Sequence, residues 1–195
     1  MRKEIFMMKL FEKYYLCLKF ELHEFHNTKL RNVHTLLRWK ENNEIMKWHH
    51  DCKYMELTRD YSVEELAKFH GHLGPFIVLG YRMGRYALKH FDNNPFALHA
   101  TVSCSGQPPE SCLIDGVQIG SGCTYGKRNI ELLVSSEISV IFRHENGKAI
   151  MMKQGNYLSK QDKYQSHGDK EIALENFAEA MYSMSDGELF TIEEQ

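Results

Sequence analysis

Two histidines and three cysteines are the residues of this 195-residue chain whose types could bind a metal ion. His70 and His72 lie in a glycine-containing segment, and Cys104, Cys112 and Cys123 follow it in the sequence. Imidazole and thiolate groups suit zinc, iron or nickel better than magnesium or calcium. The residue types therefore predict a transition-metal site.

The spacing of these residues limits how they could share one ion. In a regular helix the side chains of His70 and His72 would point apart, so both can bind only if Gly71 takes the chain out of the helix. The cysteines form no C-x-x-C pair, so they match no zinc finger or ribbon. Two alternatives remain open: the cysteines are buried as small apolar residues, or Cys123 is a nucleophile with His72 as its base.

Two charged residues near the cysteines are candidates for a catalytic role. Asp115 stands three residues after Cys112, on the same face of an expected helix, where it could orient a ligand or carry a proton. Lys127 could bind an anionic group of a substrate. The segment 122–128 departs from the G-x-x-x-x-G-K-[ST] pattern, which excludes a nucleotide-hydrolysing P-loop.

The apolar periodicity and the turn residues predict the elements that must position these side chains. Ser62 and Glu65 form a capping box at the start of a short helix, and Pro75 fits the first turn of the next. Asn146-Gly147 predicts a hairpin turn. Helices are expected up to residue 70 and over 76–91, 111–119 and 170–184, and strands over 98–104, 130–134, 138–143, 148–153 and 189–192. We expect an α+β fold in which helices pack on an antiparallel sheet.

The chain divides into two parts of different composition. All 13 glycines and all 4 prolines lie at or after Gly71, and the first 55 residues carry an excess of Lys and Arg while the remainder carries an excess of Asp and Glu. Turn residues punctuate compact folds, and the first part lacks them. We therefore expect a poorly defined N-terminal extension over residues 1–55 and one domain over residues 56–195.

The overall composition is that of a globular protein with no bulk charge to attract polyanions. Hydrophobic residues make up 43% and charged residues 26%, with a formal net charge of −2, which argues against nucleic acid and anionic membranes as partners. Charged residues such as Lys9, Glu12 and Lys13 interrupt the apolar stretch near the start, so it cannot span a bilayer. The odd number of cysteines and the lack of a secretory signal pattern favour the reducing cytoplasm.

Three separated motifs resemble the FmdE-like family, which takes its name from formylmethanofuran dehydrogenase. They are Phe69 to Pro75, Ser111 to Gln118 and Gly122 to Lys127, and the similarity extends over about Tyr61 to Ile192. The resemblance implies an α+β domain, usually a homodimer, that holds a transition metal ion, most commonly zinc. Carried over to this chain, the implied ligands are His72, Cys112 and Cys123, with His70 next.

The resemblance also implies a function. Its first form is a metal-binding accessory protein, linked by the family name to the reduction of CO2 onto methanofuran in methanogenesis and therefore to the other subunits of formylmethanofuran dehydrogenase. A standalone metalloenzyme acting on a small organic substrate is the second reading. A metal-delivery or regulatory binding protein is the third, so the sequence leaves catalysis itself undecided.

Overall fold

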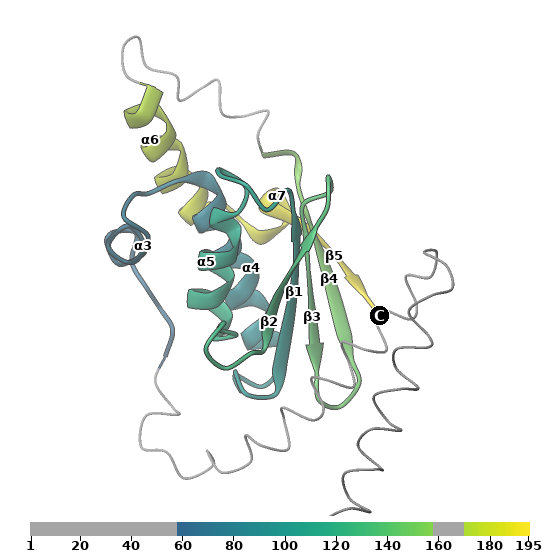
Figure 1. The fold of residues 1–195 in the computed structure, drawn as a ribbon. Coiled ribbons are helices and arrows are strands. Elements are labelled where there is room, and N and C mark those ends of the chain that lie inside the picture. The colour runs from purple at the N-terminus through teal and green to yellow at the C-terminus, as the bar shows by residue number, and fades with distance from the viewer. Residues whose placement is uncertain (1–57, 158–169) are drawn as a thin grey trace, which may run out of the picture. The chain divides into compact units, whose positions relative to one another are not determined.

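The computed structural model describes residues 58–157 and 170–195, and the expectations for the extension over residues 1–55 lie outside these ranges. In the described part, helices pack on one side of a sheet (Figure 1). The helices are α3 (Val63–His70), α4 (Pro75–His90), α5 (Cys112–Ser121), α6 (Lys170–Ser183) and α7 (Asp186–Leu189). The strands are β1 (Leu98–Cys104), β2 (Ile130–Val134), β3 (Ser139–His144), β4 (Ala149–Gln154) and β5 (Phe190–Glu194). The α+β class is confirmed, and the expected domain boundary near residue 55 stays a prediction.

The sheet is mixed, so the prediction of an antiparallel sheet was wrong in one pairing. Its strand order is β2-β1-β3-β4-β5, and only β1 and β2 run parallel, with Ala100 opposite Ile130 and Cys104 opposite Val134. The other three pairs are antiparallel. The reason is the connection: α5 lies between β1 and β2, and a helical crossover returns the chain to the end of the sheet from which β1 started.

Glycines bring α4 and α5 into unusually close contact. A Cβ atom at Gly80 or Gly116 would overlap the backbone of the facing helix, and the same holds for Gly84 and Gly120. At Gly84, for example, it would lie 2.6 Å from the backbone nitrogen of Ser121. The seam fixes the height of α5 along α4, because sliding either helix would push a side chain into the neighbouring backbone.

The side of the sheet that faces the helices forms the core. Alternate residues of the central strands, including Leu98, Val102, Phe142 and Met152, are fully buried against α4 and α5. Burying such side chains contributes about 1.5–3 kcal/mol each. On the far side of α4, Arg82 donates hydrogen bonds to the carbonyl oxygen of Tyr182 (2.6 Å) and to Asp186 (2.7 Å), which holds the end of α6 and the start of α7 against α4.

Candidate metal centre

His70 and His72 lie on either side of the point where α3 ends. The helix begins with the predicted capping box between Ser62 and Glu65, and it ends at Gly71, which adopts φ +93° in the left-handed region. A residue with a Cβ atom is disfavoured there, whereas glycine adopts this conformation readily. The reversal brings the two imidazole rings together, with centroids 4.6 Å apart and planes inclined by 42°. Gly71 thus takes the chain out of the helix, as sharing one ion requires.

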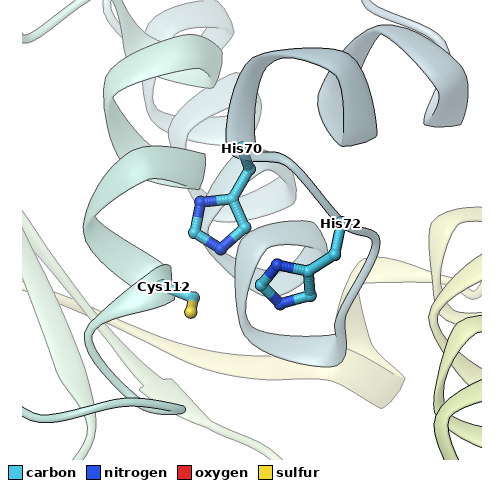
Figure 2. A group of neighbouring side chains, drawn as sticks. All are labelled: His70, His72 and Cys112. Carbon is cyan, nitrogen blue, oxygen red and sulfur yellow. The ribbon is translucent and has the colours of Figure 1, made fainter.

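Cys112 reaches the same place from a segment forty residues later in the chain. It is the first residue of α5, next to the turn that carries His72, and Figure 2 shows its sulfur on the side of the two rings. One donor atom from each of His70, His72 and Cys112 lies within 4.8 Å of the others. The three side chains are therefore a group that could hold a metal ion.

Asp115 fixes the orientation of the His70 ring. Its Oδ2 atom lies 2.7 Å from Nδ1 of His70, and its Oδ1 atom accepts a hydrogen bond of 3.3 Å from the side-chain amide of Gln118. An ionised carboxylate only accepts hydrogen bonds, so the Nδ1 atom carries the proton and the Nε2 atom keeps its lone pair. Carboxylates hold metal-binding histidines in the same way.

The Nε2 atom of His70 is buried and has no hydrogen-bond partner in the described part of the chain. Buried polar atoms are rarely left without a partner, because losing their contact with water costs about 1–3 kcal/mol. This nitrogen faces the donors of His72 and Cys112, as the close-up shows (Figure 2). A cation bound among the three donors would satisfy it.

The donor set fits a transition metal in both chemistry and spacing. Two ligands of a tetrahedral zinc ion are about 3.5 Å apart, given Zn–N of about 2.0 Å and Zn–S of about 2.3 Å. The 4.8 Å limit on the group is wider by roughly 1 Å. Because the side chain of His72 is exposed, a small rotation could close this difference. Burial, and then the charge of Asp115, raise the pKa of the Cys112 thiol, so an ion must displace its proton.

A pocket of about 550 Å³ adjoins the cluster. His72 and Cys112 form part of its wall, and Gly74 leaves the space beside the His72 ring free, since a Cβ atom there would lie 3.5 Å from Nε2 of His72. The other described lining residues are Leu73, Pro75, Phe76, Pro109, Glu171, Leu174 and Glu175. Sequence analysis missed the contribution of α6, because no local pattern indicates that a helix sixty residues after Cys112 returns to this site.

Comparison with known proteins identifies the fold and the cluster with one family. Residues 69–191 match the family model described as "FmdE, Molybdenum formylmethanofuran dehydrogenase operon", which covers both histidines, α4, α5 and the sheet into β5. The chain belongs to the FmdE family.

A curated relative of this FmdE-family chain carries a different description. The "Probable S-adenosyl-L-methionine-binding protein" of Archaeoglobus fulgidus is 32% identical over 91 residues. The match covers 43% of this chain and 24% of the relative, so the chain spans about a quarter of that protein's length. In the described part of the FmdE-family chain, no helix combines the length and the apolar character needed to cross a membrane.

Cys123 lies at the opposite end of α5 from Cys112 and is not part of the three-residue group. Ten residues of helix separate the two ends by roughly 14 Å, at a rise of 1.5 Å per residue. Burial raises the pKa of the Cys123 thiol to about 11, and the nearby cations Lys127 and Arg59 only partly oppose this effect. The structure therefore does not bring Cys123 to the predicted partners His72 and Cys112.

The two catalytic candidates are separated in the same way. Asp115 contacts His70 at the cluster, whereas Lys127 lies beside Cys123 and donates a hydrogen bond to the carbonyl oxygen of Gly122. Its ammonium group lies 4.6 Å from the centre of the Phe96 ring, and burial lowers its pKa to about 8. In the FmdE-family chain, Asp115 is thus placed to act on the cluster and Lys127 is not.

Proposed function

We propose that this FmdE-family protein binds a transition metal ion, most favourably zinc, through His70, His72 and Cys112. The observation that carries the proposal is the state of His70, whose Nδ1 atom is held by Asp115 while its buried Nε2 atom faces two further donors without a partner. Two imidazoles and one thiolate are a preferred ligand set for zinc. Cys123, which the sequence favoured as a ligand, is not part of this proposal.

Each residue has a defined task in the proposed site. Asp115 holds the His70 ring so that its lone pair faces the ion, and Cys112 offers a thiolate from the rigid start of α5. His72, on the exposed turn before α4, completes the set by rotation. A zinc ion held by three protein ligands keeps a fourth position, at which it can act as a Lewis acid.

The first role we propose for the bound ion is that of an accessory protein in the formylmethanofuran dehydrogenase system, which reduces CO2 onto methanofuran in methanogens. The family description, which names the operon of the molybdenum enzyme, supports this role. The proposed partners are a second copy of this chain and the other subunits of the dehydrogenase, in the cytoplasm. Co-purification of those subunits with the chain, and loss of the complex on removal of the ion, would be the corresponding evidence.

One observation favours a second role, that of a standalone metalloenzyme acting on a small organic substrate. The pocket beside His72 and Cys112 is within the range of about 300–1,000 Å³ that is typical of small-molecule sites. A three-ligand ion would present its open position toward this pocket. A closed four-ligand site would leave the pocket without a chemical role.

Metal analysis of variants tests the proposal directly. Protein purified without an affinity tag should contain about one zinc ion per chain, and His70→Ala and His72→Ala should each remove most of it. His90→Ala is the matched control, because His90 ends α4 away from the cluster and is exposed. Equal metal content in all three variants, or no metal in the unmodified protein after growth with zinc, would reject the site.

A further inference from the structure

The pocket beside the cluster has an uneven distribution of charge. Among its described lining residues the only carboxylates are Glu171 and Glu175, and no Lys or Arg is present. The remaining wall is largely apolar, formed by side chains such as Phe76, Pro109 and Leu174. A ligand in this pocket would therefore meet apolar surface and negative charge together.

Helix α6 supplies the negative charge from one face. Glu171, Leu174 and Glu175 are separated by three and four residues, the spacing that places side chains next to one another on a helix. The opposite face of α6, which includes Ala173, Phe177 and Met181, is buried in the core. The orientation of the helix is thus fixed by its core face, and its two glutamates lie at the pocket as a consequence.

Two carboxylates one helical turn apart repel each other by a few tenths of a kcal/mol, and a cation between them relieves this repulsion. Leu174, which lies between them in sequence, is 38% exposed, so an apolar surface is open to solvent at the same place. An ordinary solvated helix face would explain the glutamates alone. It would not explain why they line a pocket together with exposed leucine, phenylalanine and proline.

We infer that this pocket binds a small organic cation, with an ammonium group near Glu171 and Glu175 and an apolar body against Phe76 and Leu174. The same carboxylates exclude anionic compounds of equal size. As the substrate class of the metal site, this inference rests on the proposed function, since only a bound ion would make the pocket a place of reaction. The binding preference itself depends on residues of α4 and α6 that are not metal ligands.

The test compares two probes of equal length and opposite charge, 4-phenylbutylamine and 4-phenylbutyrate. Ligand-observed NMR titration of the full-length protein at pH 7 gives a Kd for each, with the metal content of every sample measured in parallel. The amine should bind measurably and more tightly than the acid. Glu171→Gln and Glu175→Gln should each weaken amine binding about two- to fivefold, the range expected for partly exposed charges.

Glu179→Gln is the matched control, because Glu179 lies one turn beyond Glu175 on α6, is exposed and does not line the pocket. It should leave both Kd values unchanged. The inference is overturned if neither probe binds, if the acid binds as tightly as the amine, or if all three variants behave alike. A protein that holds zinc but shows no preference for the amine rejects this inference alone, whereas amine binding without bound metal rejects the metal site alone.

Discussion

The two ends of α5 carry similar residues in different environments. At its start, Cys112 is half-buried beside two histidines and a carboxylate, and a pocket opens next to it. Just after its end, Cys123 is fully buried, and its charged neighbours are Lys127 and Arg59. One end therefore combines soft donors with access for a ligand, while the other combines a protonated thiol with cations, which repel a metal ion.

This difference shows that the position of a cysteine in the fold, rather than its presence in a motif, decides which chemistry it can support. The glycine seam between α4 and α5 keeps the two ends apart, because α5 cannot slide along α4. Each end can therefore be altered without moving the other. That independence makes the comparison open to experiment.

Replacing the two cysteines in turn should give the largest difference between the ends. Cys112→Ser should weaken zinc binding by more than about 100-fold, because loss of an outer-shell partner alone costs about 10–100-fold. Cys123→Ala should leave the affinity unchanged and lower the free energy of unfolding by roughly 1 kcal/mol, since it removes a buried sulfur atom. Competition with a chromophoric chelator measures the first effect and urea denaturation the second. A loss of zinc in Cys123→Ala as large as in Cys112→Ser would mean that the ends of α5 are not separate sites.

Asp115→Asn should have the next largest effect, again at the start of α5 only. The amide cannot hold the Nδ1 proton of His70 as a carboxylate does, so we expect zinc affinity to fall about 10- to 100-fold while the stoichiometry at saturation stays at one. Glu110→Gln is a suitable control, because Glu110 precedes α5 but hydrogen-bonds the backbone nitrogen of Ser105 instead. An unchanged affinity in Asp115→Asn would show that the carboxylate does not orient the ligand.

Much of this arrangement was predictable from local sequence signals. The capping box at Ser62, the proline at the start of α4 and the apolar periodicity located the helices, and the helical spacing of Asp115 and Cys112 indicated that both belong near one site. The need for Gly71 to end the helix between the two histidines followed from helix geometry.

The remainder depended on information that is not local. The parallel pairing of β1 and β2 could have been inferred from the helix between them, but the hairpin signal at Asn146-Gly147 favoured antiparallel pairing throughout. The separation of Cys123 from Cys112 depends on α5 remaining a continuous helix despite Gly116 and Gly120. These glycines suggest interruption in an isolated sequence, whereas in the fold they are the residues that let α5 pack against α4.

The smallest predicted effect concerns the far end of α5 and appears as a pH dependence of stability. Burial lowers the pKa of Lys127 from 10.5 to about 8 in the folded protein. Below pH 8 this lysine is charged in both states, so the cost of burying the charge is fully present. Between about pH 8 and 10.5 the unfolded chain binds more protons than the folded one, and the free energy of unfolding therefore rises with pH.

Cys123 acts in the opposite direction at higher pH, which leaves a narrow window for the measurement. Its pKa is raised from 9.0 to about 11, so between these values the folded protein binds more protons and stability falls as pH rises. From pH 8 to 9 the contribution of Lys127 dominates and should amount to at most about 1 kcal/mol. Urea denaturation at the two pH values should show this rise in the unmodified protein and in the exposed-lysine control Lys148→Met, but not in Lys127→Met. An identical rise in all three proteins would mean that Lys127 is solvated, and the far end of α5 would then lack the buried cation that distinguishes it from the metal-binding end.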